Sequence, residues 1–161
     1  MESKNKLLLA FFIIGLIAVA GCASQKTNGN EQISGKVADG VTATIFKSTS
    51  CGCCSIYSQY MEKKGFNVQV VDIEDLSATK NKYNIPRQME SCHTTVIGDY
   101  FVEGHVPAEA IEKLLAEKPD IAGIAMPGMP SGSPGMPGSK RGPFIVYAVN
   151  KDGSTAEFMR I

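Results

Sequence analysis

Three of the five cysteines in this 161-residue chain, Cys51, Cys53 and Cys54, fall within four residues of one another. Cys51 and Cys54 have the C-x-x-C spacing of a redox dithiol, and a helix N-terminus at this point would favour the thiolate form. Cys53 complicates that interpretation, because a third thiol competes for every disulfide and a Cys53–Cys54 bond would distort the backbone. Three thiolates within one helical turn can instead bridge soft metal ions.

The next cysteine, Cys92, is followed directly by His93 in the segment ESCHTTV. Cu(I) prefers thiolate and thioether ligands, whereas Zn(II) accepts thiolate together with imidazole. Cys92 and His93 are therefore further candidate ligands for an ion held by Cys51, Cys53 and Cys54. These ligand types leave both metals open, with zinc as the weaker alternative.

Weaker ligand candidates lie further along the chain. His105, the only other histidine, stands in VEGHVP, where a turn or capping role is commoner, although it can also orient a ligand. Met126, Met129 and Met136 lie in a Gly/Pro-rich stretch. Their thioethers suit transient capture of Cu(I), and the competing interpretation is a methionine-bearing loop that packs across the domain.

Two other interpretations of the cysteines involve no ligand. Clustered cysteines can be small buried hydrophobic residues. The four cysteines Cys51, Cys53, Cys54 and Cys92 can also form two structural disulfides, with three possible connectivities. An extracytoplasmic location would permit such bonds.

The pattern of the chain predicts an α/β domain that positions the cysteines between its first strand and first helix. Thr49 and Ser50 are predicted caps of that helix, which Gly65 ends. The order β-α-β-α-β-β-α resembles the thioredoxin fold, followed by a Met/Gly/Pro loop and a β-hairpin. In that fold the segment before the third strand lies beside the C-x-x-C motif, so Cys92 and His93 are predicted neighbours of Cys51 to Cys54. The predicted segments are strand 41–48, helix 51–65, strand 66–73, helix 75–85, two strands in 94–104, helix 107–119, loop 123–142 and a hairpin of 144–149 with 155–159.

The N-terminus has the features of a targeting segment. Residues 7–20 form an apolar run after Lys4 and Lys6, too short for a typical membrane-spanning helix and suited to a signal peptide. Small residues before Cys22 resemble a bacterial lipobox, which predicts lipid attachment at Cys22. An ordinary signal peptide or an uncleaved anchor are the alternatives.

These features predict three regions: a lipoprotein signal peptide (residues 1–21), a flexible polar tether (22–40) and a folded metal-binding domain (41–161). The domain is expected outside the cytoplasm, in the periplasm or on the cell surface, held to a membrane by the lipid. Sixteen basic and sixteen acidic residues give zero net charge, which argues against a nucleic-acid partner. The glycine-rich loop lacks the lysine of a phosphate-binding loop.

Several segments together resemble the CopG-type copper-resistance family: CGCC, YMEKKGFNV, SCHTTVIGDYFVEGHVPAEAI and GIAMPGMPSGSPGM. The resemblance runs from about Val41 to Met136. It implies a thioredoxin-like extracytoplasmic domain with a copper–thiolate cluster at Cys51, Cys53, Cys54 and Cys92, and His93 matches the histidine that adjoins the later cysteine. Met126 departs from the family pattern, which has Val before the proline.

The predicted function is therefore an extracytoplasmic copper-binding protein that holds Cu(I) in a cysteine thiolate cluster for copper resistance or handling. Other copper-handling proteins are its expected partners. The alternative is a thiol-disulfide or copper oxidoreductase that uses Cys51 and Cys54 as its redox pair. The sequence favours binding over enzymatic turnover because of Cys53.

Overall fold

The structure is a computed structural model that describes residues 38–161. The predicted signal peptide, Cys22 and most of the predicted tether lie outside the described residues. Ala38, near the end of that tether, is fully buried in the core. Within residues 38–161, the helices are all too short or too polar to cross a membrane.

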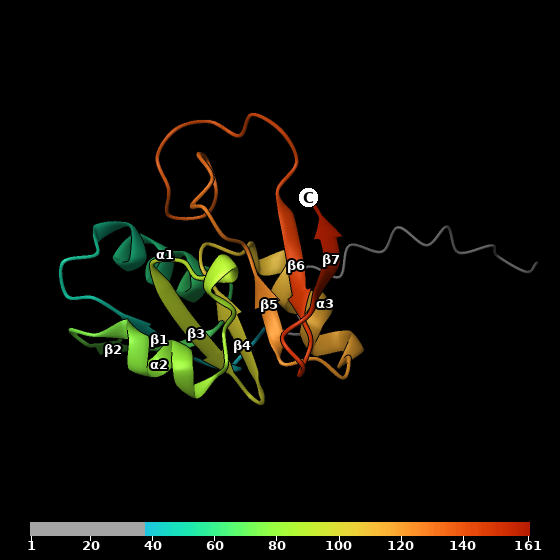
Figure 1. Ribbon diagram of the computed structural model, residues 1–161. Coiled ribbons are helices and arrows are strands. Elements are labelled where there is room, and N and C mark those ends of the chain that lie inside the picture. Colours follow the sequence, from blue (N-terminus) through green and yellow to red (C-terminus); the bar gives the residue numbers. More distant parts are fainter. Residues whose placement is uncertain (1–37) are drawn as a thin grey trace, which may run out of the picture. The chain divides into compact units, whose positions relative to one another are not determined.

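One mixed sheet forms the centre of the described domain (Figure 1). Its seven strands lie in the order β2-β1-β3-β4-β5-β6-β7. The pairs β1–β2 and β4–β5 are parallel, and the other neighbours are antiparallel. The strands are β1 (Thr42–Lys47), β2 (Asn67–Asp72), β3 (His93–Ile97), β4 (Tyr100–Glu103), β5 (Gly123–Ala125), β6 (Ile145–Val149) and β7 (Thr155–Arg160). The predicted α/β class and the terminal hairpin are confirmed.

Helices cover both faces of the sheet, and successive side chains along a strand point to opposite faces. Val102 of β4 joins the main core with residues of α1 (Gly52–Lys63) and α3 (Ala108–Glu117). Its neighbour Phe101 points to a smaller cluster with Ile85 and Met89, which follow α2 (Leu76–Lys82) in the chain. The α1 and α3 helices therefore lie on one side, and the α2 region lies on the other.

The start of α1 differs from the prediction. Cys51 is the N-cap residue and no side chain caps the helix, so the predicted capping by Thr49 and Ser50 is wrong. The Ser50 hydroxyl instead lies 3.1 Å from the Ser48 hydroxyl. The cysteine motif therefore spans the N-cap position and the first turn of α1. Gly65, with φ of +96°, follows the end of α1 as predicted.

The predicted loop 123–142 begins three residues too early, because Gly123–Ala125 form β5. All three residues are buried between β4 and β6. A Cβ at Gly123 would lie 2.2 Å from the Phe101 carbonyl oxygen, so glycine here permits close approach of two strands rather than marking a loop. Through β5, the C-terminal hairpin continues the main sheet.

Candidate metal centre

The predicted ligands meet at one end of the sheet, where three chain segments converge. Lys47 at the end of β1 pairs with His93 at the start of β3, and Thr94 pairs with Glu103 at the end of β4. The cysteine motif lies after β1, Cys92 lies just before β3, and His105 lies two residues after β4. This register brings residues distant in sequence to a single site.

Four sulfur atoms form the first part of the site. The Sγ atoms of Cys51, Cys53, Cys54 and Cys92 all lie within 4.8 Å of one another. Cys51 and Cys54 are joined by a disulfide, and Cys53 and Cys92 are free. The Cys53 sulfur lies 3.5 Å from that of Cys51. Among the described cysteines there is thus one disulfide, formed by the C-x-x-C pair, rather than the two of the structural alternative.

Two imidazoles form the second part of the site. Ligand atoms of Cys54, Cys92, His93 and His105 also lie within 4.8 Å of one another. The Cys92 sulfur is 3.1 Å from His105 Nε2 and 3.4 Å from His93 Nδ1. His105 therefore lies at least as close to the sulfurs as His93 does, although the sequence ranked it below His93.

The tautomer of His105 follows from its other contact. His105 Nδ1 lies 2.7 Å from the Pro134 carbonyl oxygen, which can only accept a hydrogen bond. Nδ1 therefore carries the proton, and the lone pair of Nε2 faces the Cys92 sulfur. Sequence reasoning missed Pro134, because a backbone carbonyl leaves no signature in residue types.

Burial sets the protonation states of the site. It lowers the pKa of His93 to about 3, with further lowering by His105 and Lys80, so this imidazole is neutral at pH 7. Burial, followed by the proximity of Cys53, raises the pKa of the Cys92 thiol to about 11. A metal ion at this site would displace a proton from sulfur but none from His93.

The donor set fits a soft metal ion. His93 is fully buried, and its Nε2 has no hydrogen-bond partner. A buried ring nitrogen without a partner costs free energy unless a ligand satisfies it. Thiolate sulfur and neutral imidazole nitrogen are the ligands that Cu(I) and Zn(II) accept.

Tyr57 of α1 packs against both imidazoles. Its ring centroid is 4.5 Å from that of His93 and 5.5 Å from that of His105. Its hydroxyl donates to the Val106 carbonyl oxygen at 2.9 Å, which fixes the ring. Tyr57 lies three residues after Cys54, and this spacing was the available sequence signal for its role.

The Gly/Pro-rich segment between β5 and β6 packs on the cysteine motif. A Cβ at Gly135, whose φ is +81°, would lie 2.8 Å from the Cys53 carbonyl oxygen and 2.9 Å from the Tyr57 nitrogen. This close approach brings residues 134 and 135 onto the first turn of α1. In Figure 1 the long orange loop before β6 extends from the same end of the sheet at which α1 begins.

The three methionines of this segment have different environments. Met126 is buried in the main hydrophobic core, as a packing role requires. Met129 is 43% exposed and has a φ of +45°. Met136 is half-buried and adjoins Gly135. Metal binding by these thioethers stays a prediction.

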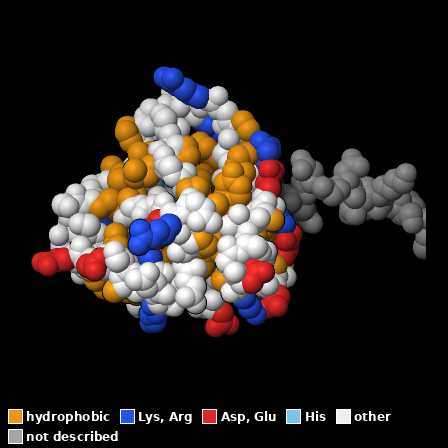
Figure 2. Space-filling view, viewed as in Figure 1, with side chains coloured by type: hydrophobic (Ala, Val, Ile, Leu, Met, Phe, Trp, Pro, Cys, Tyr) orange, Lys and Arg blue, Asp and Glu red, His pale blue; other side chains and the backbone are white. Residues whose placement is uncertain are grey.

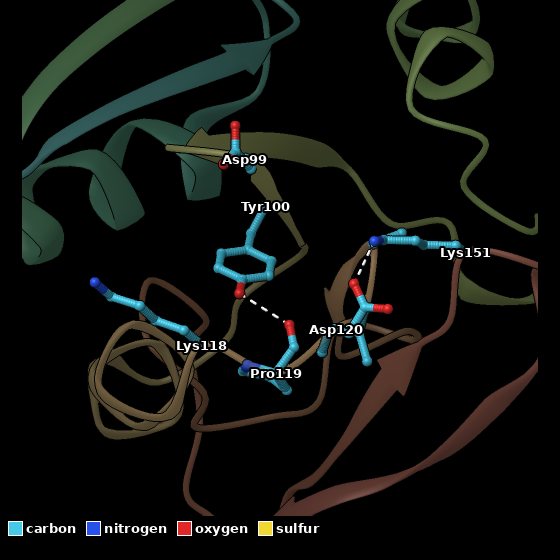
Figure 3. A pocket seen from close by; sticks show the side chains of 8 residues that line it. Asp99, Tyr100, Lys118, Pro119, Asp120 and Lys151 are labelled. Atoms are coloured by element: carbon cyan, nitrogen blue, oxygen red, sulfur yellow. Dashed lines mark hydrogen bonds and ion pairs between the residues drawn. The ribbon is translucent and has the colours of Figure 1, made fainter.

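A pocket at the opposite end of the sheet has a different character (Figure 3). Its volume is about 270 Å³, and Tyr100 at the start of β4 and Lys151 of the hairpin turn are among its lining residues. The Tyr100 hydroxyl donates to the Pro119 carbonyl oxygen, and Lys151 pairs with Asp120. The pocket contains no cysteine or histidine, so the chemistry of the site lies elsewhere.

Charged side chains of both signs occur on the face of the molecule shown in Figure 2. On the face shown in Figure 2, acidic and basic side chains are interspersed rather than gathered into one patch. This distribution agrees with the zero net charge of the chain. A polyanion would find no continuous basic surface on that face.

Comparison with known proteins identifies similar sequences and structures. Residues 89–136 match the family model described as "Protein of unknown function, DUF411". Two solved structures, "Copper resistance protein copG- Form 1" and "Form 2", are each 38% identical to this chain with a TM-score of 0.71. The alignments cover 76% of this chain and 98% and 99% of those chains. No curated protein matches the sequence.

Proposed function

The chain belongs to the CopG copper-resistance family, and from that premise we propose that it binds Cu(I) in a thiolate cluster outside the cytoplasm. One observation carries the proposal: four cysteine sulfurs lie within 4.8 Å of one another, and two of them also lie that close to two imidazoles. Copper is the cargo in this proposal. The ligands are Cys51, Cys53, Cys54 and Cys92, with His93 beside them.

The thiolates act together because each sulfur can bridge two ions. Reduction of the Cys51–Cys54 disulfide must come first, since a disulfide sulfur is a poor ligand. Cys53 then supplies the additional sulfur that a simple dithiol lacks. His105 presents Nε2 to the same region, and we include it as a candidate ligand.

Two finer features belong to the same proposal. The strand order β2-β1-β3-β4 and the element order β-α-β-α-β-β-α support a thioredoxin-like core. The lipobox-like residues before Cys22 support lipid anchoring in the periplasm or on the cell surface. Other copper-handling proteins, the partners that the sequence leads us to expect, would then meet the site at the membrane.

Copper stoichiometry tests the binding function. Reduced protein should bind more than one Cu(I) per chain, and Cys53→Ser should bind fewer because a bridging sulfur is lost. Ser50→Ala, an exposed substitution beside the motif, is the matched control. Anaerobic titration against a Cu(I) chelator measures both number and affinity. Full copper loading and affinity in Cys53→Ser would show that this sulfur does not bridge.

Metal competition separates copper from zinc. The pair of cysteines and pair of histidines in the second ligand group also suits tetrahedral Zn(II). Reduced protein incubated with both ions should retain copper, because several thiolates in one site favour the softer ion. Preferential retention of zinc would assign the site to zinc instead.

The Cys51–Cys54 disulfide favours a second function, a copper or thiol oxidoreductase. Oxidation of the dithiol to this disulfide releases two electrons and two protons. The two electrons would reduce two Cu(II) ions to Cu(I), and the protons would pass to solvent. Cys51 occupies the N-cap position of α1, so after reduction the free N–H groups of the helix favour its thiolate as the nucleophile, with Cys54 as the resolving thiol.

Disulfide mapping distinguishes the two functions. Metal-free protein that forms only Cys51–Cys54 and turns over a model disulfide, with copper blocking the reaction, would establish the oxidoreductase. Mixed disulfides that include Cys53 and Cys92, with slow or no turnover, would support binding. Peptide mapping of the oxidised protein gives the pairing, and a disulfide-reduction assay gives the rate.

A further inference from the structure

A buried ion pair lies beside the segments that carry Cys92, His93 and His105. Lys80 of α2 and Glu103 of β4 are 6% and 0% exposed, and their side chains form a salt bridge. Buried ion pairs are seldom more stabilising than well-packed apolar residues of the same volume. Stability alone therefore does not account for a charged pair at this position.

The carboxylate of Glu103 holds both ends of the segment that carries two candidate ligands. Its Oε1 accepts a hydrogen bond from the Ser91 backbone N–H at 2.5 Å. Its Oε2 accepts one from the Thr94 hydroxyl at 2.6 Å. Cys92 and His93 are the two residues between these anchor points.

The residues after Glu103 connect the same contacts to the third ligand candidate. The Gly104 N–H donates to the His93 carbonyl oxygen at 3.1 Å. Gly104 has a φ of +80°, and a Cβ there would lie 2.7 Å from the Ser91 hydroxyl. The turn into His105 is thus packed directly against the segment that Glu103 holds.

Lys80 explains why the anchor is a charged carboxylate. Its Nζ contacts Glu103 and lies 3.5 Å from the Thr94 hydroxyl. A carboxylate accepts hydrogen bonds more strongly than a neutral amide, and the lysine compensates its charge in the interior. A glutamine at this position would turn one acceptor into a donor that faces other donors.

We propose that Glu103, held by Lys80 and Thr94, is a positioning residue that fixes Cys92 and His93 for metal binding. The inference rests on the proposed copper function. Glu103 itself contacts no ligand atom of the centre, and it acts through the backbone of Ser91 and the side chain of Thr94. Groups that orient metal ligands typically affect affinity by about 10–100-fold.

A pair of adjacent threonines gives a matched test. Thr94 and Thr95 are both fully buried on β3, but the Thr95 hydroxyl has no hydrogen-bond partner, whereas that of Thr94 bonds Glu103. Thr94→Val removes one contact to Glu103 and keeps the side-chain shape. Thr94→Ser keeps the hydroxyl, and Thr95→Val is the control that touches no carboxylate.

Two readouts are needed, one with copper and one without. Cu(I) affinity, measured by chelator competition, should fall about tenfold in Thr94→Val and at least as much in Glu103→Gln. Thr94→Ser should restore it, and Thr95→Val should match wild type. In metal-free protein, hydrogen exchange of the amides at residues 91–93 should accelerate in Thr94→Val and Glu103→Gln only.

The outcomes separate this inference from the copper function. Unchanged copper affinity and exchange in Thr94→Val and Glu103→Gln would overturn the positioning role while leaving copper binding intact. If wild type binds no Cu(I), the copper function fails, and the amide exchange still decides whether Glu103 orders residues 91–93. If Glu103→Gln does not fold, the comparison of Thr94→Val with Thr94→Ser decides.

Discussion

Cys54 and Cys92 belong to both ligand groups of the centre, the all-sulfur group and the group with two histidines. At the residue scale, these two sulfurs are therefore the shared members of two overlapping candidate sites. Shared sulfurs are the requirement for a cluster in which thiolates bridge neighbouring ions. The raised pKa of Cys92 means that copper must compete with a proton for that sulfur.

The pH dependence of stability tests the burial of His93. Its folded pKa of about 3 lies below the ordinary value, so the unfolded chain binds a proton that the folded protein excludes. The contribution of His93 to the free energy of unfolding is complete above about pH 6.5. As the pH falls from there to about 3, this contribution decreases by up to about 1.4 kcal/mol per pH unit.

Denaturant unfolding of metal-free protein from neutral to acidic pH measures this slope. His93→Gln should show a shallower decline, since glutamine does not titrate. Carboxyl groups also contribute to acid unfolding, and comparing the two proteins at each pH cancels their share. An identical slope in both proteins would mean that the pKa of His93 in the folded protein is not lowered, so that it binds a proton as readily as in the unfolded chain.

At the element scale, the centre depends on three backbone segments that approach closely. The first turn of α1 carries three of the cysteines, the start of β3 and the residue before it carry His93 and Cys92, and residues 134–135 of the loop before β6 contact α1 and His105. The loop supplies the Pro134 carbonyl that orients His105. It is therefore part of the candidate metal centre as well as a connection between strands.

Two glycines of this loop provide a controlled prediction. Gly135→Ala would place a Cβ within 2.9 Å of α1 backbone atoms, so the loop must move away from the helix. Gly128 has a similar φ, +82°, but a Cβ there meets nothing within 4 Å. Both substitutions incur backbone strain of about 1–3 kcal/mol, and only Gly135→Ala should also weaken Cu(I) affinity.

Thermal unfolding and chelator competition on both variants separate these effects. Similar losses of stability with a selective loss of affinity in Gly135→Ala would establish that the loop completes the site. Equal affinity in the two variants would show that its packing on α1 has no part in copper binding.

At the scale of the whole molecule, the sequence predicted the strand and helix order well because each element is locally marked. Pro107 and Pro119 bracket α3, and Gly98-Asp99 marks the turn between β3 and β4. It failed at β5, where Gly123 is required by contact with Phe101, a residue distant in sequence. Long-range contacts of this kind have no local signature.

The candidate site was predictable to the same extent. Cysteine spacing and the adjacent Cys92-His93 pair indicated the ligand types, and the predicted element order placed the segment before the third strand beside the cysteine motif. The tautomer of His105 depends on its hydrogen bond to the Pro134 carbonyl oxygen. The proposed role of Glu103 depends on hydrogen bonds from residues of a neighbouring segment, among them the Ser91 N–H. Neither relation is visible without the fold.

Membrane attachment is a prediction about the whole chain. Wild-type protein should fractionate with membranes, and Cys22→Ala should remain as an uncleaved precursor or become soluble, because the modified cysteine is lost. Fractionation with mass spectrometry of the mature N-terminus measures this. A mature protein with an unmodified terminus elsewhere would exclude lipidation at Cys22.

The positions of β5 and β6 have a consequence for the loop that orients His105. The loop that carries Pro134 leaves the sheet at β5 and re-enters it at β6, which is held by β7 at the C-terminal edge. A protease that clipped the last strand would therefore loosen one end of the loop without touching a ligand. Loss of β7 would thereby disturb the loop that orients His105, although β7 is remote in sequence from the thiols.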